Sequence, residues 1–267
     1  MTDETPEPRI EAPSALSRFL GSPRAGAAAL VVSVAALGLA SLPWLGVGGT
    51  SDSAIRAYLL NHPEMLQEMS RALQAKEATT LAETITQRAA VSPSLLAADT
   101  RDAAFGPVDA KVTVVEFFDF RCPGCKATAP DMLRLMQAHP DVRFVFKDWP
   151  ILDRGDPAGP SHHAARAAQA AHDQGKYLPV FRALMAEVDL TPETIDAILV
   201  DNGVSLETAH AAMVSADMTR HLVDTDTAAL SLGLQATPTF LVNGRALSSI
   251  QPDAIEAAIR DAKARAR

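Results

Sequence analysis

The sequence predicts an α/β protein in which one β-sheet is begun, interrupted by a helical insertion and then completed. A strand–helix–strand pattern covers residues 112–147, and the pattern from 158 to 233 is helical throughout. Strand character returns only at residues 239–242, directly before an Asn-Gly pair that is typical of a hairpin turn. These observations predict a parallel βαβ unit and a ββα unit that belong to one sheet.

Composition limits the classes of function. The chain has 267 residues, 48% hydrophobic and 21% charged, which allows one or two domains with a proper core. A net charge of −8 argues against a nucleic-acid partner, which requires a basic face. The sequence contains no phosphate loop or dinucleotide motif, so no cofactor is predicted.

The N-terminal region predicts export. Residues 1–24 are rich in proline and charge and predict a disordered cytoplasmic tail, and the apolar segment 25–47 is long enough to cross a bilayer as a helix. Arg18 and Arg24 precede this segment and Asp52 follows it, so the positive-inside rule places the rest of the chain in the periplasm, anchored to the inner membrane. A cleaved signal peptide, which would leave a soluble periplasmic protein, is the alternative. Both interpretations place the cysteines where disulfides persist.

Residues 53–90 predict a helical stalk. Pro63 suits a first-turn position, and a thin apolar stripe follows at three-to-four spacing: Leu66, Met69, Leu73, Leu81 and Ile85. Such a helix requires a partner, either the body of its own chain or the same helix in other copies. Residues 91–104 predict a linker with a break at Ser92-Pro93, and the domain follows at 105–267.

The elements of this domain follow in order. The apolar run 112–119 predicts a buried strand, a helix then extends to about His139, and 142–147 predicts the second strand. Glycine and proline breaks divide the insertion of about 158–233 into helices at 160–174, 177–188, 192–202, 205–214 and 217–233. A return strand at 245–249 and an amphipathic helix at 252–264 complete the chain.

Cys122 and Cys125 are the two cysteines of the chain, and they flank Pro123 and Gly124. A lone close pair predicts a redox-active dithiol, although zinc sites share this spacing and an inert clamp is an alternative. Cys122 lies between a strand end and a helix start, where unpaired N–H groups favour the thiolate. We therefore predict that Cys122 is the nucleophile and that Cys125, one helical turn later, is the buried resolving partner.

Two segments resemble the DsbA family of thioredoxin-fold proteins: residues 106–125, which end in the Cys-Pro-Gly-Cys motif, and Ala236-Thr-Pro-Thr-Phe240. The resemblance covers about residues 105–265. It implies a thioredoxin-like fold with an inserted helical domain, here preceded by the stalk and the N-terminal transmembrane helix. It also implies that Pro238 is cis and faces the sulfurs, and that Thr237, Pro123 and Gly124 contact the client polypeptide. DsbA-type oxidases often carry a histidine between the cysteines, so this motif predicts a less stabilised thiolate and a less oxidising disulfide.

Glu116 lies six residues before Cys122 within an otherwise apolar strand. A lone carboxylate there is costly unless it is neutral or hydrated. Thioredoxin-fold oxidoreductases hold a buried acid at this spacing, and the resemblance implies that Glu116 relays protons for Cys125. The alternative is a solvent-facing residue on an edge strand.

The predicted function is a periplasmic thiol–disulfide oxidoreductase that forms, reduces or isomerises disulfides in exported proteins. Its predicted partners are cysteine-containing exported proteins and a membrane redox partner. Residues 55–66 resemble the stalk of the copper-sensitivity-suppressor type of DsbA-like protein, which mediates oligomerisation, and this favours a homo-oligomer and an isomerase.

Two other classes of function stay open. The dithiol could bind Cu(I) as a metal-handling module, or the domain could be a non-redox peptide-binding scaffold. His162 and His163, with Asp153 and Asp156 nearby, indicate a surface pair at a helix start and not a metal site.

Overall fold

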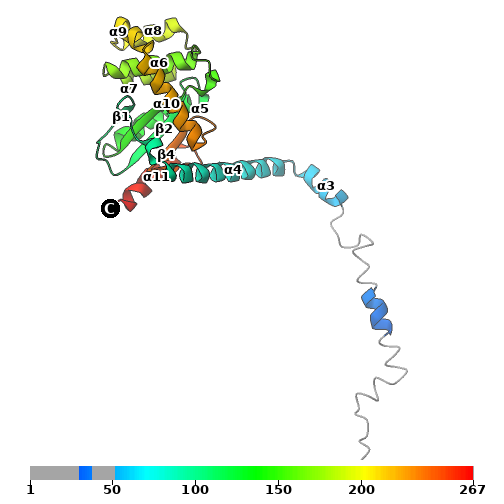
Figure 1. Ribbon diagram of the computed structural model, residues 1–267. Coiled ribbons are helices and arrows are strands. Elements are labelled where there is room, and N and C mark those ends of the chain that lie inside the picture. Colours follow the sequence, from blue (N-terminus) through cyan, green and yellow to red (C-terminus); the bar gives the residue numbers. More distant parts are fainter. Residues whose placement is uncertain (1–29, 38–51, 267) are drawn as a thin grey trace, which may run out of the picture. The chain divides into compact units, whose positions relative to one another are not determined.

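The computed structural model describes residues 30–37 and 52–266 (Figure 1). The chain divides into two compact units, Met1–Ser70 and Arg71–Arg267. Helix α4 (Glu64–Val91) contributes residues to both, so the second unit begins within the range predicted to form the stalk.

The first unit is helical where it is described. Residues 30–37 are helical, and α3 (Asp52–Asn61) ends before Pro63, which separates it from α4. Among residues 30–37 and 52–266, the structure contains no helix that is both long and apolar enough to span a bilayer. The predicted tail at 1–24 and most of the predicted membrane segment at 25–47 lie outside the described residues.

The second unit contains a mixed sheet of five strands in the part of the chain that the structure describes. These are β1 (Ala103–Phe105), β2 (Thr113–Phe118), β3 (Arg143–Asp148), β4 (Thr239–Val242) and β5 (Arg245–Ala246), in the spatial order β1-β3-β2-β4-β5. β2 and β3 are parallel and joined by α5 (Pro123–Ala138), and the other neighbours are antiparallel. β2 is almost continuously apolar because helices cover both faces of the sheet.

The predicted helical insertion is present between β3 and β4. It consists of α6 (Pro160–Asp173), α7 (Tyr177–Ala186), α8 (Pro192–Asp201), α9 (Leu206–Met213) and α10 (Ala216–Leu232). Side-chain caps begin three of these helices: Thr191, Ser205 and Ser215 each accept a hydrogen bond from a backbone N–H three residues later. In Figure 1, α6 to α9 form a group beside the sheet and α10 runs from this group back towards it.

The sheet separates two hydrophobic cores. On one face Val114, Phe118 and Phe146 pack with α5, the insertion helices α6 and α7, and the C-terminal helix α11 (Pro252–Arg265). On the opposite face Phe117, Val145 and Leu241 pack with the C-terminal half of α4 and with α10. Alternation of side chains along β2 assigns each residue to its core.

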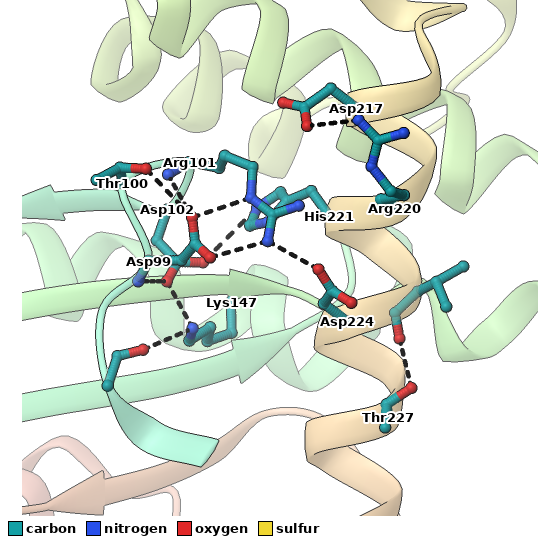
Figure 2. Close-up of polar contacts among 12 residues, drawn as sticks. Asp99, Thr100, Arg101, Asp102, Lys147, Asp217, Arg220, His221, Asp224 and Thr227 are labelled. Atoms are coloured by element: carbon teal, nitrogen blue, oxygen red, sulfur yellow. Dashed lines mark hydrogen bonds and ion pairs between the residues drawn. The ribbon is translucent and has the colours of Figure 1, made fainter. Parts of the chain in front are cut away.

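A buried polar network lies on the α10 face (Figure 2). Nζ of Lys147 is 2.5 Å from Oδ2 of Asp102, and the two side chains are 8% and 0% exposed. His221 of α10 places Nε2 3.6 Å from Oδ1 of Asp102, and Arg101 binds Asp224 of α10 at 2.7 Å. The network joins the segment before β1 to β3 and α10.

Three segments differ in detail from the sequence prediction. The predicted linker contains a 3₁₀ turn, Pro93–Leu96, and ends in β1, an edge strand whose three residues are too few to show alternation. The return strand is β5 alone, because Pro252 starts α11 and Ser248 and Ser249 are poor strand formers. The Asn243-Gly244 hairpin is present, with φ values of 47° and 77°.

Candidate active site

Cys122 lies between the end of β2 and the start of α5. Its extended backbone makes it the N-cap of α5, and Pro123 occupies the first turn, where it is exposed. The N–H of Cys122 donates to the carbonyl of Asp119 at 3.0 Å, which fixes the turn out of the strand. The sulfur is therefore held at the N-terminal end of a helix, as the sequence predicted.

The surroundings of Cys122 favour its thiolate. They lower the pKa of the thiol to about 5, mainly through a hydrogen bond from Cys125. Burial opposes this shift, while Thr237 and the backbone N–H groups of Gly124 and Cys125 add to it. As a thiol, Cys122 donates to the carbonyl oxygen of Thr237 at 3.1 Å. Backbone groups and the second cysteine thus supply the stabilisation that a histidine between the cysteines would otherwise give.

Cys125 has the opposite character. Its side chain is 0% exposed, against 8% for Cys122. Burial raises the pKa of Cys125 far above its ordinary value, and the hydrogen bond to Cys122 and the charge of Glu116 raise it further. Cys125 is therefore a thiol that reacts only after losing its proton inside the protein.

The loop before β4 lies against the cysteine motif. The Thr237–Pro238 peptide bond is cis. A Cβ added to Gly124 would lie 3.1 Å from Cδ of Pro238 and 3.7 Å from Sγ of Cys122. Glycine at this position permits the close approach of the two loops. The structure thus brings together the residues that the sequence singled out at the sulfurs: Cys122, Cys125, Gly124, Thr237 and Pro238.

Glu116 lies in β2 beneath this motif. Its side chain is 1% exposed, and neither carboxyl oxygen has a hydrogen-bond partner. Burial, with a smaller contribution from the charge of Asp148, raises the pKa of Glu116 to about 8. An acid with this pKa can accept and return a proton near neutral pH. The solvent-facing alternative for Glu116 is wrong, because β2 is the central strand.

Asp119 is a site residue that the sequence analysis did not identify. Its carboxylate accepts hydrogen bonds from the N–H of Arg121 at 2.8 Å, the N–H of Leu152 at 3.0 Å and the hydroxyl of Ser161 at 2.9 Å. These bonds join the cysteine turn to the segment after β3 and to α6. The only available signal was an acid at the end of an apolar strand.

The histidine pair does not form a metal site. Nδ1 of His162 lies 3.0 Å from Oδ2 of Asp153, whose Oδ1 also receives a hydrogen bond from Arg121 at 3.2 Å. Within the described ranges, no group of three or more His, Cys, Asp or Glu side chains is arranged to hold a metal ion.

We expect Cys122 to react with iodoacetamide at a rate that is constant at neutral pH and falls as the pH drops through about 5. An ordinary thiol would show its midpoint at about 8.5. The measurement is alkylation rate against pH, with the modified cysteine identified by mass spectrometry. The variant Cys125→Ala removes the main hydrogen bond to the thiolate, so its midpoint should lie at higher pH. An unchanged midpoint in this variant would contradict the assigned cause.

Comparison with known proteins agrees with this geometry. The family described as Thioredoxin matches residues 98–261, and the family described as Copper resistance protein ScsC N-terminal domain matches residues 52–79. A Na(+)/H(+) antiporter NhaA 3 of Salinispora tropica is 36% identical over 172 residues, which are 62% of this chain and 26% of the antiporter. The chain thus spans about a quarter of the length of the curated relatives it matches.

Solved structures show the same fold. A thioredoxin-like oxidoreductase from Silicibacter pomeroyi is 32% identical, with a TM-score of 0.57, and the match covers 62% of this chain and 94% of that one. BcfH of Salmonella enterica Typhimurium is 25% identical, with a TM-score of 0.60 and coverage of 86% and 99%. The chain therefore belongs to the thioredoxin family, as a DsbA/ScsC-type thioredoxin-fold protein of the thiol–disulfide oxidoreductase kind.

Proposed function

We propose that this protein exchanges thiols and disulfides in exported proteins through Cys122 and Cys125. The observation that carries the proposal is the asymmetry of the two sulfurs. Cys122 has a pKa of about 5 and lies against the carbonyl of Thr237, whereas Cys125 is fully buried and has a raised pKa. One sulfur is prepared to attack and the other to resolve.

In the reducing direction, the Cys122 thiolate attacks one sulfur of a client disulfide. A Cys122–client disulfide forms, and the other client sulfur leaves as a thiolate. Cys125 then gives its proton to the Glu116 carboxylate and attacks Sγ of Cys122. The second client sulfur leaves as a thiolate, so the client gains two electrons and the protein retains an internal disulfide. The same steps in reverse oxidise a client.

The cis-Pro238 loop supplies the place where the client lies. The residues Gln235 and Ala236, before Thr237, are exposed, and their backbone is free of the sheet ladder, which starts at Thr239. An extended client can pair with this edge beside Cys122. The half-buried Gly124 and the exposed Pro123 complete the surface around the sulfur.

The stalk supports an oligomer. None of the residues of α3 is buried, and large apolar side chains are exposed along α3 and the start of α4, among them Tyr58, Leu60, Leu66 and Met69, at 55% to 75%. We propose that copies of the chain associate through 53–90, so that several sites act on one client, which favours an isomerase. The apolar segment 25–47 and the arginines before it support a periplasmic catalytic domain tethered to the inner membrane.

The test is to trap the mixed disulfide. We expect the full chain carrying Cys125→Ser to form a covalent adduct with insulin through Cys122, because the resolving thiol is lost. Mass spectrometry after digestion identifies the linked cysteine, and dithiothreitol must release the insulin. Light scattering on the same sample gives the oligomer mass.

The matched control is Cys122→Ser, which retains one cysteine, the buried one, and should form no adduct. Failure of Cys125→Ser to form an adduct would contradict the exchange function. A monomeric mass would contradict the isomerase assignment and leave the exchange chemistry standing.

A further inference from the structure

A second carboxyl group lies buried on the same face of the sheet as Glu116. In the parallel pairing of β2 with β3, Glu116 is opposite Phe146 and Phe118 is opposite Asp148. Because side chains alternate along a strand, Glu116 and Asp148 project from the same face in successive rows. Each is 1% exposed. The two carboxyl groups therefore share one layer from which water is excluded.

This layer is short of hydrogen-bond donors. Oδ2 of Asp148 accepts from Nε2 of Gln169 and, at 3.5 Å, from the hydroxyl of Tyr177. Oδ1 of Asp148 and both oxygens of Glu116 have no partner in the described part of the chain. A carboxyl group gains a donor only when it is protonated. A proton on either acid is thus the donor that these oxygens lack.

The charged and titratable neighbours of Asp148 come from several elements. Glu116 of β2 is on its own face, with Cys125 of α5 acted on by the charge of Glu116, and Tyr177 of α7 contacts it. Asp102 acts from the network on the other face of the sheet, where Lys147 pairs with it. Burial is the main cause that raises the pKa of Asp148 to about 8, and the charge of Asp102 raises it further.

We propose that Asp148 is a positioning residue for proton transfer, and that Glu116 and Asp148 act as one coupled carboxyl pair in exchanging a proton with Cys125. The proposal rests on the exchange function proposed above. The proton of Cys125 passes to the Glu116 carboxylate while the Cys125 sulfur attacks Cys122 and the client thiolate leaves. Asp148 transfers no electrons. Its charge determines the pH at which Glu116 is ionised and so able to accept the proton.

The pair also serves the reverse step. Two neighbouring buried carboxylates resist simultaneous ionisation, as in other paired acids that share one proton. One of the two groups therefore retains a proton at neutral pH, and that proton can return to the Cys125 thiolate when the internal disulfide is opened. The sheet register thus places a proton donor and a proton acceptor together below the sulfurs.

The test measures the resolving step against pH in the full chain. Reduced protein is mixed with excess oxidised glutathione, quenched with acid and analysed by mass spectrometry, which separates the Cys122–glutathione adduct from the internal disulfide. The second phase is independent of glutathione concentration and reports attack by Cys125. We expect its rate to rise with pH through the ionisation of the pair.

The variants identify the role of each acid. We expect Asp148→Asn to move this rise about one pH unit lower, because a neighbouring negative charge is removed. On the acid side of the rise, resolution should then be up to about tenfold faster than in the wild type. Glu116→Gln should lack the rise, and the double variant should behave as Glu116→Gln alone. Asp226→Asn, an exposed acid on α10 that bonds Trp149, is the matched control and should leave the profile unchanged.

Two results would overturn the proposal or its basis, and they are distinguishable. A wild-type profile in Asp148→Asn, with the rise lost in Glu116→Gln, removes Asp148 from the proton transfer and leaves the exchange function intact. Absence of any glutathione adduct on Cys122 in the wild type overturns the exchange function itself. If Asp148→Asn does not fold, carboxyl ¹³C titration of the wild type decides: a coupled two-step titration supports the pair, and an independent single-step titration of Asp148 overturns it.

Discussion

We expect Cys122→Ser to lower the rate of insulin reduction by at least about 10³-fold, because loss of a nucleophile removes the reaction path itself. Serine lacks the sulfur that forms the mixed disulfide, and its hydroxyl does not ionise near neutral pH. The surrounding contacts change little, since Cys122 donates one hydrogen bond, to the carbonyl of Thr237, that a hydroxyl can also donate. The measurement is the steady-state rate of insulin reduction with dithiothreitol as the electron source.

Cys125→Ser is the matched control for this prediction, because it is the same substitution three residues later. It should retain the first attack on a disulfide at a rate near that of the wild type and then stop at the adduct. Equal residual turnover in the two variants would mean that the sulfurs are not differentiated, contrary to their exposure of 8% and 0%. Circular dichroism and thermal unfolding confirm that both variants fold.

The second large effect concerns stability. We expect Lys147→Met to lower the free energy of unfolding by about 3–5 kcal/mol, because it leaves the Asp102 carboxylate buried without its cation. The two groups are 2.5 Å apart, and the Asp102 side chain is 0% exposed. In Figure 2 the lysine reaches Asp102 from β3, and the remaining contacts come from Asp99 and His221. The backbone N–H of Asp99 alone cannot compensate a full charge. Guanidinium unfolding of the full chain at pH 7 measures the change.

Two companion variants separate the loss of a pair from the exposure of a lone charge. The double variant Asp102→Asn with Lys147→Met removes both charges and should recover most of the loss. Arg220→Ala breaks the exposed ion pair with Asp217, whose side chains are 65% and 64% exposed, and should change stability by no more than about 0.5 kcal/mol. A single Lys147→Met variant as stable as Arg220→Ala would show that Asp102 is neutral or solvated in the folded protein.

Much of the fold could be predicted because its signals are local. The strand at 112–119, the hairpin at Asn243-Gly244 and the five insertion helices each carry periodicity or a turn signal of their own. β1 carried none, because its three residues become a strand only by pairing with β3. The same limit applies to the C-terminal half of α4, whose sparse stripe became informative once Ala82, Ile85 and Ala89 were found to be buried.

The candidate site divides in the same way. The cysteines, Glu116 and the Thr237-Pro238 segment were identifiable from spacing and resemblance, since each lies in a recognisable motif. Asp119 and Asp148 were not, because an acid at a strand end is ordinary in sequence. Their importance depends on the pairing of β2 with β3 and on the helices that bury them, which are contacts between distant parts of the chain.

The burial of Cys125 also determines how the protein meets oxidative damage. A peroxide reaches Cys122 first and converts its thiolate to a sulfenic acid, which further peroxide would carry irreversibly to the sulfinic acid. Cys125 lies within hydrogen-bond reach of that sulfur and is shielded from the same reagent. Its thiol condenses with the sulfenic acid, releases water and leaves the ordinary internal disulfide. Because the chain has two cysteines, no third thiol competes for this step. The resolving cysteine is therefore also a safeguard that returns an oxidised centre to the reducible pool.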